Sequence, residues 1–175
     1  NRAALFGAVE HQIPLAAGSA GAILVVRHGD RIEFPAVAGH DHERFPLQVP
    51  SDGAPPAVAA LGLTVPVFFG TTAQMLDQQP DLADFAAASD HGAWAALPVR
   101  DVGVLVVTWR DAQVFSPAQR AFLETVANLY AAAAELLWTS GNRGDGDLVA
   151  MIASAVRDSG PRAESPAAYV TALAQ

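Results

Sequence analysis

Two histidines and two carboxylates occupy four consecutive positions, His40, Asp41, His42 and Glu43, within the segment GHDHERF. On an extended backbone alternate side chains project to the same side, so His40 and His42 could present two imidazole ligands to a metal ion. A catalytic zinc ion needs a third protein ligand and an open position, and no third ligand is evident, because Glu43 points elsewhere. We therefore predict a solvated, charged loop without a metal, in which His40 could still face a ligand pocket.

Two other short motifs contain residue types that could do chemistry. Ser89, Asp90 and His91 are the residue types of a hydrolytic triad, but we expect that neighbours in sequence cannot converge as nucleophile, base and orienting acid. We interpret them as a polar helix end that leads into Gly92. The tripeptide at 143–145 matches an adhesion motif, and we attribute it to chance because nothing in the chain indicates secretion.

Cysteine and lysine are both absent from the sequence. Without cysteine there is no thiolate nucleophile, disulfide, iron–sulfur cluster or thiolate zinc site. Without lysine there is no P-loop and no Schiff-base chemistry. The formal net charge of −8 disfavours nucleic acid and anionic lipid as partners. We therefore expect small molecules or proteins as partners, and no cofactor.

Length and hydropathy indicate one folded domain with a short appendage. The 175 residues, 51% of them hydrophobic, are enough for a proper core. No apolar run approaches the roughly 18 residues of a membrane span, and no signal peptide opens the sequence. We therefore expect a cytoplasmic location.

Hydrophobic periodicity and turn residues predict the elements that must position these side chains. They are a helix over 3–15, strands over 22–26 and 32–38, a loop over 40–56, a short helix over 57–61, a strand over 65–69, a helical segment from 71 to 88 interrupted near Pro80, and strands over 93–99 and 102–109. The last strand is apolar on both faces of its pleat, so we expect both faces to be covered.

Two helix starts carry capping signals. Thr71 and Gln74 have the spacing of a capping box, and Ser116, Pro117 and Gln119 open the longest helix with three agreeing signals. The apolar positions of the longest helix alternate four and three apart, as in a helix–helix seam: Phe122, Val126, Leu129, Ala133 and Leu136. We interpret 1–140 as the main domain, 141–147 as a linker rich in glycine and aspartate, and 148–175 as a helical C-terminal appendage.

The order of these elements and four short motifs resemble GAF domains of bacterial signalling proteins. The motifs are PDLADF at 80–85, WAALPV at 94–99, VGVLVV at 102–107 and FSP at 115–117, and the likeness covers about residues 5–138. The resemblance implies an α+β fold of the GAF/PAS-like type. Its central antiparallel sheet has about five strands, with the N- and C-terminal helices packed on one face and a loop- and helix-roofed pocket on the other.

The resemblance also implies a non-catalytic sensory or regulatory domain that controls an output domain or a partner protein in signal transduction. No output domain is recognisable, so we expect a piece of a larger bacterial regulator. An apolar or aromatic small molecule fits better than a nucleotide, whose phosphate would need a cluster of arginines. The candidate pocket residues, each of which could instead simply fill the core, are Phe45, Phe69, Met75, Phe85, His91, Trp94 and Thr108.

Departures from well-understood GAF subtypes exclude several ligands. Bilin-binding members and the free-methionine-sulfoxide reductases need cysteine, and the motif of cyclic-nucleotide-binding members contains a lysine, so the sequence lacks the residues for all three. Haem-binding members need an axial histidine, which His40, His42 or His91 could supply, and that option stays open.

The terminal helices are predicted to form a homodimer. The candidate interface residues are Phe6, Leu129, Leu136, Leu137 and Trp138. The alternative to sensing is a GAF scaffold with a collapsed pocket that serves only homodimerisation or protein contact.

Overall fold

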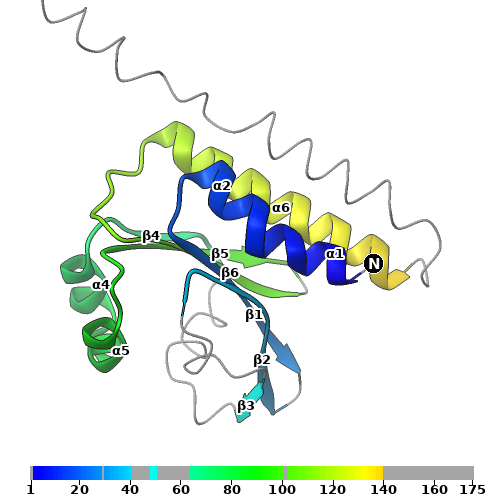
Figure 1. Ribbon diagram of the computed structural model, residues 1–175, viewed down its shortest axis with the longest axis horizontal. Coiled ribbons are helices and arrows are strands. Elements are labelled where there is room, and N and C mark those ends of the chain that lie inside the picture. Colours follow the sequence, from blue (N-terminus) through cyan, green and yellow to red (C-terminus); the bar gives the residue numbers. More distant parts are fainter. Residues whose placement is uncertain (1, 29, 41–47, 51–63, 101, 140–175) are drawn as a thin grey trace, which may run out of the picture.

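The computed structural model of the chain describes residues 2–28, 30–40, 48–50, 64–100 and 102–139 (Figure 1). Three predicted segments, the short helix over 57–61, the linker over 141–147 and the appendage over 148–175, lie outside these ranges. Within the described ranges, no helix combines the length and apolar character that crossing a membrane requires.

One antiparallel sheet organises the fold, as predicted. Its strands are β1 (Gly21–His28), β2 (Arg31–Ala38), β3 (Gln48–Pro50), β4 (Val67–Phe69), β5 (Ala93–Val99) and β6 (Gly103–Trp109). They lie in the order β3-β2-β1-β6-β5-β4, so the N-terminal hairpin and the β5–β6 hairpin join through β1 and β6 at the centre. The three-residue strand β3 falls within the loop predicted over 40–56, and that part of the prediction is wrong. An edge strand tolerates a proline such as Pro50, because one side of it needs no ladder hydrogen bonds.

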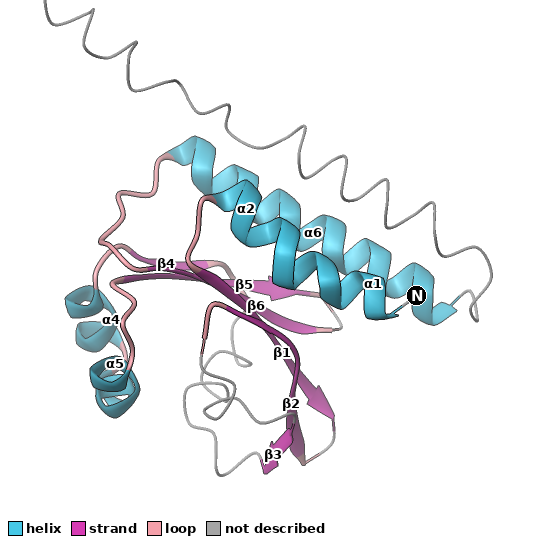
Figure 2. Ribbon diagram, viewed as in Figure 1, coloured by secondary structure: helices cyan, strands magenta, loops and turns pink. Residues whose placement is uncertain are grey.

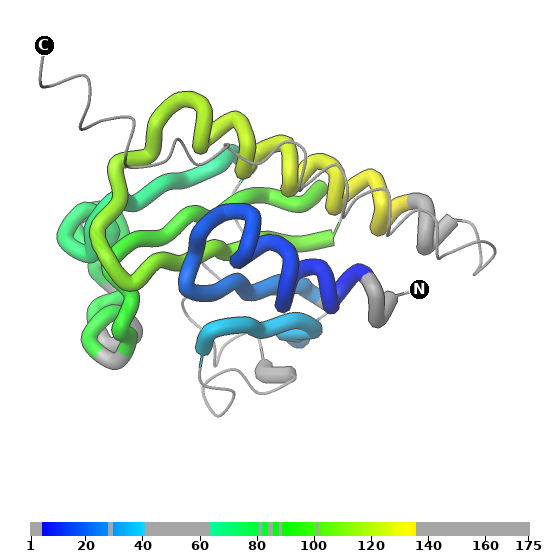
Figure 3. The backbone as a smooth tube through the Cα atoms, turned by 45° about the horizontal axis from the view of Figure 1, so that its top comes forward, coloured from blue at the N-terminus to red at the C-terminus, as the bar shows by residue number. Residues whose placement is uncertain are grey.

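The N- and C-terminal helices lie side by side on one face of the sheet (Figures 1 and 3). The N-terminal helix consists of α1 (Arg2–Gly7), a π-helical turn η1 (Ala8–Gln12) and α2 (Ile13–Ala17), and the C-terminal helix is α6 (Pro117–Thr139). The first helix therefore runs two residues beyond its predicted end. It stops at Gly18, whose φ of 59° is left-handed, where the Ser19 amide donates to the Pro14 carbonyl.

The main core fills the space between these helices and the sheet. Leu5 and Val9 from the first helix, Leu24 from β1 and Leu105 from β6 are all buried in it, and Phe122 and Val126 of the predicted seam face it from α6. The buried Tyr130 hydroxyl donates to the Leu5 carbonyl at 3.2 Å and so ties α6 to α1.

Shorter helices pack at the β4–β5 end of the sheet, away from α1 and α6 (Figure 2). They are α4 (Thr72–Gln78), the 3-10 turn η3 (Pro80–Leu82) and α5 (Ala83–Ala88), so the interruption near Pro80 is confirmed. With helices on one side and this layer on the other, Leu105 and Thr108 of β6 are both fully buried. The prediction that both faces of this strand are covered is therefore confirmed.

Both predicted helix starts are capped, although one differs in detail. The Ser116 hydroxyl accepts from the Gln119 amide at 3.2 Å, and the Gln119 side chain accepts from the Ser116 amide at 2.9 Å. The Thr71 hydroxyl likewise accepts from the Gln74 amide at 3.1 Å. The Gln74 side chain, however, accepts from the amide of Gly70 at 2.8 Å, one residue before the cap.

Candidate functional site

The side chains of strands β5 and β6 alternate between the two faces of the sheet. Trp94 and Thr108 are cross-strand partners, as are Ala95 and Val107 one position along. Because side chains alternate along a strand, the two pairs face opposite sides. Ala95 and Val107 belong to the main core under the terminal helices. Trp94 and Thr108 therefore face the side that the GAF resemblance assigns to a ligand.

An apolar floor covers part of this face. Phe69 of β4, Met75 of α4, Ala86 of α5 and Trp94 of β5 form one buried cluster, and each is at most 8% exposed. The structure thus brings together three of the predicted pocket residues, Phe69, Met75 and Trp94. They come from three elements, and α4 and α5 supply the cover that buries them.

His40 reaches this face by a sharp turn after β2. Gly39 has a left-handed φ of 69°, which favours glycine, and it redirects the chain so that His40 Nε2 lies 3.0 Å from Thr108 Oγ1 on β6. The imidazole passes over Gly21 of β1. A Cβ at Gly21 would lie 3.0 Å from both Cδ2 and Nε2 of His40, so the missing side chain is what makes room for the ring.

His91 meets His40 from the other side, in the loop between α5 and β5. The two imidazoles stack with their centroids 4.4 Å apart and their planes 27° apart. The His91 ring also lies 5.7 Å from the Trp94 ring, at the edge of the apolar floor. Only 2% of the His91 side chain is exposed. His40 therefore links the predicted pocket residues Thr108 and His91, and His91 in turn contacts Trp94.

Two polar groups hold one nitrogen of His91. Ser89 Oγ and Asp90 Oδ1 each lie 3.1 Å from His91 Nδ1, and the Asp90 Oδ2 atom lies 3.9 Å from Arg110 Nε at the surface. The short turn after α5 lets Ser89 and Asp90 fold back onto the ring. They do not converge as nucleophile and orienting acid, in line with the sequence-based expectation, since serine and aspartate would have to engage opposite nitrogens.

The two imidazoles are uncharged at neutral pH. Burial lowers the pKa of His40 to about 4, helped by His91 and opposed by Asp90. Burial also lowers the pKa of His91, while Asp90 acts in the opposite direction and Arg110 adds to the lowering. His91 Nε2 is buried and has no hydrogen-bond partner among the described residues. The site therefore combines an apolar floor with an unsatisfied polar atom.

Several predicted residues cannot be placed in this site. Phe45, like Asp41, His42 and Glu43, lies outside the described residues, and the side chain of Phe85 on α5 is not described. In the described part of the chain, no three histidine, aspartate or glutamate side chains gather closely enough to hold a metal ion. The metal and haem hypotheses that involve His42 stay untested.

The predicted dimer residues are placed only in part. Phe6 packs against the main core, and Leu129 is half-buried on α6. Leu136, Leu137 and Trp138 belong to α6, but their side chains lie outside the described residues. The homodimer stays a prediction.

Sequence reasoning missed the roles of Gly21, Ser89 and Asp90. Ser89 and Asp90 directly precede His91 and were interpreted as a polar helix end, not as groups that orient the ring. Gly21 directly precedes the strand predicted over 22–26, and its sequence neighbours suggest no role in a site. Its role depends on His40, which follows β2, and nothing in the sequence around either residue indicates that the two meet.

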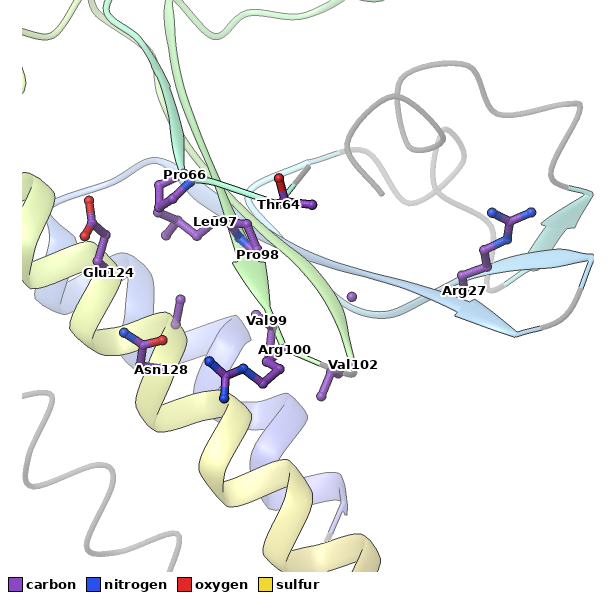
Figure 4. A pocket seen from close by; sticks show the side chains of 12 residues that line it. Arg27, Thr64, Pro66, Leu97, Pro98, Val99, Arg100, Val102, Glu124 and Asn128 are labelled. Carbon is purple, nitrogen blue, oxygen red and sulfur yellow. The ribbon is translucent and has the colours of Figure 1, made fainter. Parts of the chain in front are cut away.

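A cleft of about 600 Å³ lies at the other end of the sheet, between the β5–β6 turn and α6. Figure 4 shows Arg100 of this turn close to Asn128 of α6, with Pro66 and Glu124 farther along the cleft. Among the predicted pocket residues whose side chains the structure describes, none lines this cleft: Phe69, Met75, His91, Trp94 and Thr108. It is therefore separate from the site around His91.

No protein-family model matches the chain, and no curated protein matches it. Several solved structures, in contrast, are similar to it. The second GAF domain of DevS from Mycobacterium smegmatis is 19% identical with a TM-score of 0.60, and the match covers 82% of this chain and 100% of that one. The GAF domain of an Acinetobacter phosphoenolpyruvate-protein phosphotransferase is 17% identical, with a TM-score of 0.60 and coverage of 80% and 87%.

An enzyme is also among the similar structures. A type II free methionine-R-sulfoxide reductase from Thermoplasma acidophilum is 17% identical with a TM-score of 0.52, and the match covers 73% of this chain and 93% of that one. At these identities the likeness concerns the fold alone. The chain has the GAF fold, an α+β arrangement around an antiparallel sheet, as the sequence resemblance implied.

Proposed function

We propose that this chain, which has the fold of a GAF domain, is a non-catalytic sensory module of a larger regulator. It binds a small apolar or aromatic molecule on the sheet face opposite α1 and α6, and it signals through these terminal helices. The observation that carries the proposal is the apolar floor of Phe69, Met75 and Trp94 beside two stacked, uncharged imidazoles, the half-buried His40 and the buried His91. Ligand sites combine such apolar linings with a few polar points.

The arrangement of the polar groups supports a binding role over a catalytic one. Ser89 and Asp90 occupy the same nitrogen of His91, so no relay from a nucleophile through a base is assembled. The similar reductase indicates that this fold can support an enzyme. The cysteines that the resemblance implies for that chemistry are missing from this sequence.

A route for signalling follows from the two faces of β5 and β6. The strands that carry Trp94 and Thr108 toward the ligand side carry Ala95 and Val107 into the core beneath the terminal helices. A shift of these strands on binding would therefore reach α6 directly. The Tyr130 hydroxyl then couples α6 to α1 through the Leu5 carbonyl. Binding changes the output only if the ligand prefers one arrangement of these helices.

Two buried tryptophans on opposite faces provide the test. Trp94 lies in the apolar floor, whereas Trp109 lies in the main core against Phe115, with ring centroids 5.1 Å apart. Single-tryptophan variants, W109F/W138F and W94F/W138F, report on one face each. We expect apolar and aromatic compounds from a screening panel to change the emission of Trp94 saturably and to raise the melting temperature. The Trp109 reporter is the matched control and should respond much less.

The result that would count against sensing is equally direct. If no compound changes the Trp94 emission, and native mass spectrometry of the freshly purified protein gives only the apo mass, the binding proposal fails. That outcome favours the second candidate function, a ligand-free scaffold. The close packing of Phe69, Met75, Ala86 and Trp94 is the observation that favours a scaffold. A scaffold should be dimeric by light scattering at tens of micromolar, and a monomer would remove that candidate as well.

A further inference from the structure

We propose that His91 Nε2 is the hydrogen-bond acceptor for the ligand of this site, and that the ligand is a neutral, ring-containing molecule with a hydroxyl or N–H donor. This inference rests on the proposed function and defines its ligand class. Asp90 is then the residue that determines specificity without touching the ligand, because it sets which nitrogen of His91 carries the hydrogen.

The tautomer of His91 follows from its partners. Asp90 Oδ1 lies 3.1 Å from Nδ1 as an ion-pair contact, and because an ionised carboxylate only accepts hydrogen bonds, this contact favours a hydrogen on Nδ1. The Ser89 hydroxyl, also 3.1 Å away, can donate or accept and fits either tautomer. If Nδ1 carried a lone pair instead, it would face a second lone pair on the carboxylate. A neutral imidazole with its hydrogen on Nδ1 has an acceptor at Nε2.

The free nitrogen points away from solvent. Asp90 is 70% exposed and Nδ1 is directed toward it, so Nε2, on the far side of the ring, is directed inward. His40 stacks on the face of the His91 ring, whereas the Nε2 lone pair lies in the ring plane. Stacking with His40 therefore does not occupy this edge. A buried acceptor without a donor is costly, and unsatisfied groups of this kind are rare in folded proteins.

The surroundings select a neutral donor over a charged ligand. Both imidazoles are uncharged at neutral pH, so they provide no positive charge for a carboxylate or phosphate, and a lone pair at Nε2 would repel such an anion. Arg110 and Asp90 lie at the surface and face each other. The rings of Trp94 and the side chains of Phe69 and Met75 provide an apolar contact surface next to the acceptor. A phenol-like molecule satisfies both requirements.

The tautomer can be measured without any ligand. Protein labelled with ¹⁵N-histidine should show, in long-range proton–nitrogen spectra at pH 7, a hydrogen on Nδ1 of His91 and a lone pair on Nε2. A hydrogen on Nε2 would overturn the inference, whatever the protein binds. Asp90→Ala should allow both tautomers, because only Ser89 remains at Nδ1. Asp111→Ala, at another exposed aspartate, is the matched control and should leave the spectrum of His91 unchanged.

Three probes of similar size then test the ligand class. They are phenol, which has a hydroxyl donor, anisole, in which a methyl ether replaces it, and benzoate, which is an anion. We expect phenol to shift the Nε2 resonance of His91 and to bind at least about tenfold more tightly than anisole, and we expect no binding of benzoate. The preference for phenol over anisole should disappear in His91→Phe and weaken in Asp90→Ala. It should persist in His11→Phe, which alters an exposed histidine.

The outcomes separate this inference from the proposed function. If phenol and anisole bind equally well and both change the Trp94 emission, the site binds apolar molecules but the role of Nε2 is wrong. If benzoate binds more tightly than phenol, the inference is also wrong. If none of the probes reaches Trp94 at millimolar concentration, the inference fails, and the wider compound panel then decides the proposed function. Should His91→Phe fail to fold, Asp90→Ala still tests the preference, because it leaves the ring in place.

Discussion

The imidazole rings of His40 and His91 stack with their centroids 4.4 Å apart, although the two residues lie in loops on opposite sides of the two central strands. His40 follows β2 and His91 precedes β5, and strands β1 and β6 lie between these two in the sheet. The contact is possible because His40 crosses Gly21 on β1 and reaches Thr108 on β6. A pair of neutral bases, one half-buried and one buried, thus spans the centre of the candidate ligand face.

This pair should make the stability of the protein fall on acidification. The pKa of His40 is about 4 in the folded protein and 6.5 when unperturbed, so between these values the unfolded chain binds a proton that the folded one does not. Its contribution is therefore complete above pH 6.5 and is lost as the pH falls toward 4. Urea unfolding at several pH values should show a slope of at most about 1.4 kcal/mol per pH unit from this residue. His40→Gln, which cannot titrate, should reduce the slope, and an unchanged slope would contradict the assignment.

Removing the Thr108 hydroxyl should destabilise the fold. Thr108→Val keeps the shape of the side chain but takes away the hydrogen bond to His40 Nε2 in a fully buried position, which should cost about 1 to 3 kcal/mol of unfolding free energy. The matched control is Thr125→Val, because Thr125 donates to the Ala121 carbonyl at an exposed position of α6. We expect a change within about 0.5 kcal/mol there. Equal effects in urea unfolding would argue against a special role for Thr108.

Adding one methyl group at Gly21 should displace His40. The new Cβ would lie 3.0 Å from two atoms of the imidazole and 2.5 Å from the Ala38 carbonyl oxygen, so we expect Gly21→Ala to cost about 1 to 3 kcal/mol. Gly7→Ala is the control, because nothing lies within 4 Å of its Cβ position and alanine favours the helix there by about 0.5 to 1 kcal/mol. Thermal unfolding would show opposite signs for the two variants. A stable Gly21→Ala protein with unchanged His40 resonances would mean that the ring does not occupy this space.

The link between the terminal helices should depend on one hydroxyl. Tyr130 is 1% exposed, and burial raises the pKa of its hydroxyl, which donates to the Leu5 carbonyl. Tyr130→Phe removes this bond without changing the ring, and we expect a loss of about 1 kcal/mol. Hydrogen exchange should rise in α1 more than in β5. Uniform exchange across both elements would show that the hydroxyl does not hold α1 in place.

Much of the fold could be predicted from local patterns. The apolar runs over 93–99 and 102–109 assigned both strands, and the serine, proline and glutamine at 116–119 marked the start of α6 correctly. The short edge strand β3 and the π-helical turn η1 were not predicted. Neither has a local signal of its own. An edge strand such as β3 forms only where a neighbouring strand can pair with it, here residues 31–33 of β2.

The sequence by itself determined the main helices and strands and which of their residues are apolar, since caps, turns and periodicity act within a few residues of one another. It also identified Phe69, Met75, His91, Trp94 and Thr108 as candidates for one site. Only the tertiary structure decided that Ser89 and Asp90 share one nitrogen of His91, and that His40 lies over Gly21 to reach Thr108. These contacts depend on strand order and on a missing Cβ, and both are properties of the assembled sheet.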